Sequence, residues 1–123
     1  MKFHLQSATG KNLFTGHGAA YVAVNGVRYA RSLVVTPARV IEDWPATDFD
    51  HLTAQHFEFL RALEPDILLL GTGAALRFPP PQLSSCLNAS RIGLEVMDNP
   101  AVCRTYNILT AEGRNVVAAM LLG

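Results

Sequence analysis

The fold of this chain is decided by residues 91–107, which read RIGLEVMDNPAVCRTYN. The apolar run over residues 92–96 predicts a buried strand. Asn99 is a favoured cap and Pro100 a favoured first helical residue, so the pattern predicts a helix from there to about Ala111. A short strand that leads directly into a capped helix is typical of the right-handed β-α-β unit.

The neighbouring segments extend this unit on both sides. Residues 66–70 read DILLL, a continuous apolar run that is typical of a strand buried on both faces. Residues 116–122 predict the closing strand, and residues 82–89 predict a short helix between the first two strands. A helix is also expected over residues 50–63, with Asp50 as its cap, because apolar residues recur there at spacings of three and four.

The first half of the chain is rich in strand-forming residues. Residues 21–24 and 27–30 are joined by Asn-Gly at 25–26, and this predicts a hairpin with a type I′ turn. Further strands are expected at 33–35 and 40–41, and a short one at 3–5. We therefore predict a single domain over residues 1–123 of the α/β class, with an α+β tendency in its N-terminal half. Its three layers would be a mixed sheet flanked by helices, with an N-terminal β-hairpin followed by β-α-β-α-β.

Composition narrows the classes of function. The chain has 123 residues, of which 50% are hydrophobic and 16% charged, and this suits one packed core. Ten basic residues balance ten acidic ones, so the chain lacks the basic field of a nucleic-acid binder. A net charge of zero gives little protection against self-association, and we expect that a homo-oligomer can form.

The chain also lacks the marks of a secreted or membrane-spanning protein. No apolar run approaches the ~20 residues that a transmembrane helix needs. Its two cysteines, Cys86 and Cys103, do not form a disulfide framework in a chain of this size. We expect a reducing, cytoplasmic compartment.

The predicted topology places a candidate binding site. Loops that leave the carboxyl ends of parallel strands lie at one edge of the sheet, so the loop at 71–73 should lie beside the helix that begins near 99. Backbone N–H groups there would bind a small anion or a nucleotide fragment. The candidate ligand-binding residues are Gly71, Thr72, Gly73, Asp98, Cys103, Arg104 and Thr105. The alternative is that the glycines only turn the chain, and a dinucleotide is disfavoured because Leu76 stands where the third glycine belongs.

Individual side chains allow two interpretations each. The helix dipole and Arg104 could make Cys103 a reactive thiol, but a buried apolar residue is the simpler interpretation. Arg104 could equally form an ion pair with Asp98 or Glu95. The histidines lack metal-ligand spacing, and no nucleophile elbow is present, so we expect no metal, no cofactor and no catalytic residue.

Several motifs together resemble one known family. They are Val24–Gly26, Leu68–Gly73, Gly93–Asp98, Cys103–Asn107 and Glu112–Arg114. The chain resembles the Mth-type domain family from about Gly18 to Leu122. This family was long catalogued as a domain of unknown function, and its relatives include an adipogenesis-associated protein and a mitochondrial assembly factor for respiratory complex I.

The resemblance implies a compact three-layer α/β fold without established catalytic activity. It also implies a protein partner and a role in the assembly of respiratory complexes. The chain shows no mitochondrial presequence, which is consistent with a bacterial, cytoplasmic member. The first hypothesis is thus a non-catalytic interaction or assembly module. The alternative is a small-ligand binder or enzyme that uses the loop at 71–73 and the helix start at Cys103 and Arg104.

Overall fold

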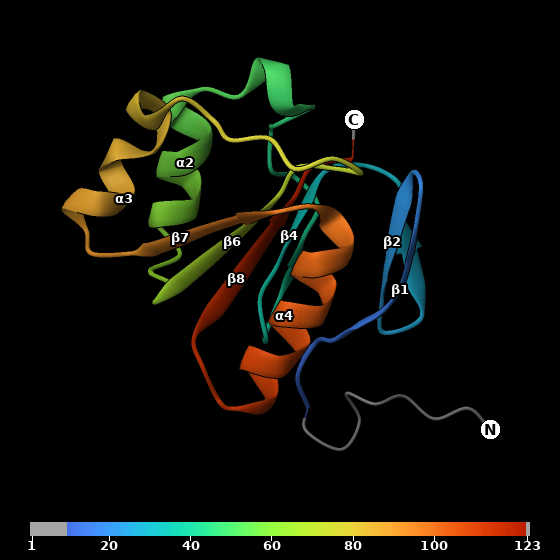
Figure 1. Cartoon of the computed structure of the whole chain (residues 1–123). Helices are drawn as coiled ribbons and strands as arrows, with labels where there is room; N and C mark the ends of the chain where they lie inside the picture. Colours follow the sequence, from blue (N-terminus) through green and yellow to red (C-terminus); the bar gives the residue numbers. More distant parts are fainter. Residues whose placement is uncertain (1–9, 123) are drawn as a thin grey trace.

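A computed structural model describes residues 10–122 and arranges them around a five-stranded mixed sheet (Figure 1). Strand β6 lies between β7 and β8 and runs parallel to both, whereas β4 is antiparallel to β8 and to β5. The sheet order is β5 (Val40–Ile41), β4 (Leu33–Val35), β8 (Val116–Met120), β6 (Ile67–Gly71) and β7 (Gly93–Met97).

Helices cover both faces of this sheet. Helices α2 (Ala54–Arg61) and α3 (Ser85–Ala89) lie on one face, and α4 (Asn99–Ala111) lies on the other (Figure 1). The side chains of β6 alternate accordingly, because Leu68 and Leu70 pack with α2 whereas Leu69 packs with α4. A central strand with both faces covered needs an apolar residue at every position. The predicted three-layer α/β architecture is confirmed.

The predicted hairpin forms, but not as part of the main sheet. Strands β2 (Tyr21–Val24) and β3 (Val27–Tyr29) pair through a turn in which Asn25 and Gly26 have φ of 53° and 83°. Together with β1 (Phe14–Gly18) they make a separate antiparallel sheet. The expectation of one sheet was therefore wrong, and the physical reason lies in helix α4.

Helix α4 holds the small sheet through one amide side chain. Asn107 Oδ1 accepts the N–H of Phe14 at 2.9 Å, and Asn107 Nδ2 donates to the carbonyl of Phe14 at 2.8 Å. The helix side chain thus takes the place of a neighbouring strand for β1. The Tyr106 ring packs edge-on against the Phe14 ring, with 5.2 Å between the ring centroids, and Tyr106 is fully buried.

Several predicted element boundaries were wrong. The helix expected over 50–63 is a 3-10 helix, η1 (Phe49–His51), followed by α2, because Leu52 and Thr53 have extended backbone between them. The helix expected over 82–89 begins as the 3-10 helix η2 (Pro81–Ser84). The closing strand ends at Met120 instead of residue 122. The strand expected at 3–5 lies outside the described residues.

Helix α4 is also capped differently from the prediction. Asp98 is the cap, and its Oδ1 accepts the N–H of Ala101 at 2.9 Å. Asn99 is already the first helical residue. This one-residue shift frees the Asn99 side chain for another role.

None of the helices formed by residues 10–122 combines the length and the apolar content that crossing a bilayer requires.

Candidate functional site

The structure brings the two predicted loops together. The N–H of Thr72 donates to the carbonyl of Met97 at 3.0 Å, and the N–H of Asn99 donates to the carbonyl of Gly73 at 2.8 Å. We call the meeting of residues 71–73 with residues 97–99 the loop junction. Its predicted position at the carboxyl edge of the parallel strands is confirmed.

The side chain of Asn99 fills the loop junction. Asn99 Oδ1 accepts the N–H of Gly73 at 3.0 Å, and Asn99 Nδ2 donates to the carbonyl of Leu121 at 3.0 Å. The residue is only 5% exposed. A Cβ at Gly71 would collide with Asn99 Oδ1, so the absence of a side chain at position 71 makes room for the amide. Asn99 therefore joins three segments that are far apart in the sequence.

Sequence reasoning missed this residue by treating it as a helix cap. A signal was present, because Asp98 and Asn99 are two good caps in succession and one helix start uses only one of them. The second polar side chain then needs partners elsewhere if it is buried.

The remaining residues of the predicted site are placed as follows. Thr72 Oγ1 donates to the carbonyl of Ala75 at 2.7 Å and accepts the N–H of Arg77, so the loop is closed on itself. Thr105 is half-buried, and Arg104 is exposed. Among residues 10–122 Arg104 forms no ion pair, so the interpretation that pairs it with Asp98 or Glu95 was wrong.

The donors that the anion hypothesis needs already have partners in the chain. The N–H of Gly73 is bound by Asn99 and that of Ala101 by Asp98. An anion at this edge would have to displace both side chains. Binding of a small anion or nucleotide fragment at the loop junction stays a prediction.

Cys103 is buried, which confirms its interpretation as an apolar residue of the helix face. Burial raises the pKa of its thiol to about 11. At pH 8 the thiolate fraction should then be about 100-fold below that of an unfolded chain. We expect iodoacetamide to alkylate Cys103 at least that much more slowly in the native protein than in urea, as measured by mass spectrometry on the Cys86→Ala variant. Equal rates in the two states would contradict this placement.

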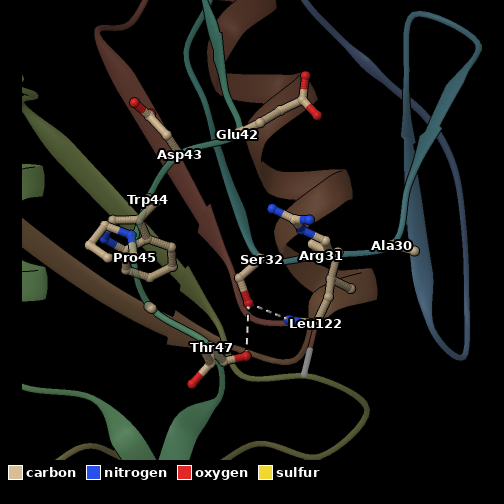
Figure 2. A pocket seen from close by; sticks show the side chains of 10 residues that line it. Ala30, Arg31, Ser32, Glu42, Asp43, Trp44, Pro45, Thr47 and Leu122 are labelled. Carbon is tan, nitrogen blue, oxygen red and sulfur yellow. Dashed lines mark hydrogen bonds between the residues drawn. The ribbon is translucent and has the colours of Figure 1, made fainter.

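A second concave site lies at the same edge of the main sheet, where the start of β4 lies beside the end of β8 and the chain after β5 diverges from β4. It is a cavity of about 470 Å³ (Figure 2). An adjoining cavity of about 270 Å³ shares four of its residues, Ala30, Arg31, Ser32 and Glu42. We call the two cavities together the β4–β5 groove.

One end of the groove is held by Ser32. Its Oγ donates to the carbonyl of Thr47 at 3.2 Å and accepts the N–H of Leu122 at 3.0 Å, as the dashed lines in Figure 2 show. Trp44 is 3% exposed, and its Nε1 donates to the carbonyl of His56 at 3.2 Å. These bonds fix the apolar wall of the cavity.

Charged side chains line the rest of the groove. Arg31 comes from the segment before β4, and Glu42 and Asp43 come from the segment after β5 (Figure 2). In the sequence these two carboxylates indicate only a loop. The groove was missed because it depends on the divergence of two strands, which no local pattern encodes.

Four aromatic residues were expected to be core or, alternatively, a surface patch. Phe14 and Trp44 are buried, and Tyr21 and Tyr29 are half-buried. In the described part of the chain, no three or more His, Cys, Asp or Glu side chains are grouped so that they could hold a metal ion.

Comparison with known proteins gives a family match over most of the chain. Residues 14–121 match the family model described as "Protein of unknown function (DUF498/DUF598)". The chain is 31% identical over 100 residues to NADH dehydrogenase [ubiquinone] 1 alpha subcomplex assembly factor 3 of Bos taurus. That match covers 80% of this chain and 54% of the relative, so the chain spans about half the length of this relative.

Solved structures agree with the observed fold. A crystal structure of a protein from Bordetella parapertussis has a TM-score of 0.85 at 37% identity, over 92% of this chain and 97% of that one. A solution structure from Bordetella pertussis, described as a Mth938-like domain, has a TM-score of 0.82 at 32% identity, over 99% of this chain and 92% of that one.

Proposed function

Because this chain belongs to the DUF498/DUF598 family, and with it to the Mth-type domains, we propose that it is a non-catalytic protein-interaction module that acts in the assembly of a respiratory complex. The observation that carries the proposal is its identity of 31% to a relative named as an NADH dehydrogenase assembly factor. Since the chain spans about half of that relative, the relative's role is transferred here only as part of this proposal. We propose the bacterial cytoplasm as its location.

An exposed apolar loop supports a protein partner. Phe78 is 71% exposed and Leu76 is 51% exposed. Arg77 between them is fixed, because its guanidinium lies 4.1 Å from the Phe49 ring centroid and 2.8 Å from the Asp50 carboxylate. A fixed loop that presents large apolar side chains to solvent is typical of an interaction surface.

The proposal predicts an assembly defect. Deletion of the chain from cells that naturally make it should reduce the amount of assembled respiratory NADH dehydrogenase on native gels by about tenfold, and the wild-type chain should restore it. The variant Leu76→Ser/Phe78→Ser should restore it poorly, since it removes the exposed apolar contact. Val27→Ser removes an exposed apolar side chain in the small sheet and should restore assembly fully. Normal levels of the assembled enzyme in the deletion strain would contradict the proposal.

A further inference from the structure

We propose that the β4–β5 groove binds an extended peptide segment of the partner protein, which adds a short strand beside the N-terminal end of β4. The inference deepens the proposed function, since it assumes that the chain has a protein partner. It adds a second contact surface to the loop of Leu76 and Phe78, and states the chemistry by which the partner binds there. Backbone geometry, shape and charge each contribute to it.

The backbone argument starts from the pairing of β4 with β5. Thr36 and Arg39 exchange hydrogen bonds at 2.8 and 3.3 Å, so they are a hydrogen-bonded pair. Such pairs alternate along an antiparallel ladder, and the next ones fall at Val34 with Ile41 and then at Ser32. The pairing of β4 with β5 ends at Val34, because the chain leaves β4 after Ile41.

Ser32 therefore directs its backbone N–H and C=O toward the groove instead of toward a strand. On its other side, β4 pairs with β8 from Leu33 onward. Within residues 10–122 neither backbone group of Ser32 forms a hydrogen bond, although the residue is buried. Both groups therefore lack a partner in this part of the chain, and an added strand supplies both partners at once.

The shape of the groove fits an extended chain. The smaller cavity is lined by residues 28–33, and the larger one shares residues 30–32 with it, so the hollow follows the backbone from the end of β3 to the start of β4. Trp44, Pro45, Ala46 and Leu122 give the larger cavity an apolar wall, which suits one apolar side chain of the peptide. Its volume is that of a typical ligand site.

The charges specify the neighbours of that apolar side chain. Arg31 lies on one wall, and Glu42 and Asp43 lie on the other, and none of the three has an ion-pair partner in the part of the chain that the structure describes. The occupant we assign is an extended segment with an apolar residue between a basic residue, facing Glu42 and Asp43, and an acidic residue, facing Arg31.

The test is selection of dodecapeptides from a random phage-displayed library on the purified wild-type chain, followed by titration of the enriched peptides in amide NMR spectra. The expected peptides combine an apolar residue with one basic and one acidic neighbour, and they shift the resonances of residues 28–33 and 42–47. Arg31→Glu should weaken their binding about tenfold or more. Arg39→Glu makes the same charge change at the far end of β4 and β5 and should leave binding within about twofold.

Both variants alter exposed side chains, and their spectra report whether the fold is intact. Peptides that shift other residues, or that bind Arg31→Glu as well as wild type, would overturn the assignment. The assignment would also be overturned if a mixture of free amino acids shifts the amide resonances of the groove residues while no peptide does. The peptide-binding test is independent of the assembly assay. Peptide binding at the groove can therefore be disproved while the proposed assembly function stands, and the assembly function can be disproved while peptide binding stands.

Discussion

Replacing Asn99 with alanine should lower the free energy of unfolding by about 2–4 kcal/mol. The variant leaves the N–H of Gly73 and the carbonyl of Leu121 without their partners in the loop junction, and each unpaired buried group costs about 1–3 kcal/mol. Urea unfolding measures the change through the fluorescence of Trp44, which is buried and is the one tryptophan of the chain.

Asn115→Ala is the matched control. The Asn115 amide donates one hydrogen bond, to the carbonyl of Glu64, and the residue is exposed. Water can replace that bond, so we expect a loss below about 1 kcal/mol. If the two alanine variants lose the same stability, Asn99 does not hold the junction together.

Replacing Tyr106 with alanine should cost about 3–5 kcal/mol, the range for removing a large aromatic side chain from a core. Tyr106 is fully buried between the main sheet and the small sheet, and its ring packs against Phe14. The variant removes the apolar contact that α4 makes with the small sheet, and leaves the Asn107 hydrogen bonds to Phe14 in place. Urea unfolding measures the loss, and amide exchange should show residues 14–29 opening first.

Tyr106→Phe separates the ring from the hydroxyl, which donates to the carbonyl of Asn12 at 3.0 Å. We expect a loss of about 1 kcal/mol.

Burial also raises the pKa of Tyr106 to about 12. The unfolded chain therefore releases this proton first as the pH rises above about 10, and native stability falls between about pH 10 and pH 12. The free energy of unfolding of Tyr106→Phe should fall less steeply over that pH range than that of the wild type. An identical pH dependence of the two proteins would contradict a buried hydroxyl.

The parallel half of the fold could be predicted because its signals are local. The apolar run at 68–70 and the strand that leads into the helix start near 99 are each contained in a few residues. Together these two signals predict where the parallel strands end, and therefore where the two loops meet in the loop junction. The hairpin was equally local, because Asn25 and Gly26 alone supply the two positive φ angles.

What the sequence did not reveal depends on distant partners. Strand β1 reads FTGHG, which has no alternation of apolar and polar residues. It forms by pairing with β2, and its first residue is bound by the amide of Asn107, which lies far along the chain. The role of Asn99 requires knowing where Leu121 ends up. The groove exists because β5 leaves β4 after Ile41, and strand lengths are decided by tertiary packing more than by propensity.

Photo-crosslinking in cells tests most directly whether the chain is an interaction module that works through the β4–β5 groove. Benzoylphenylalanine would replace Ala30, which lines both cavities, or Ala38, which is exposed in the turn between β4 and β5. We predict that position 30 forms an adduct with one subunit of a respiratory complex, through a segment with an apolar residue between a basic and an acidic one, and that position 38 forms none. Equal labelling at the two positions, or no adduct at position 30, would contradict the account.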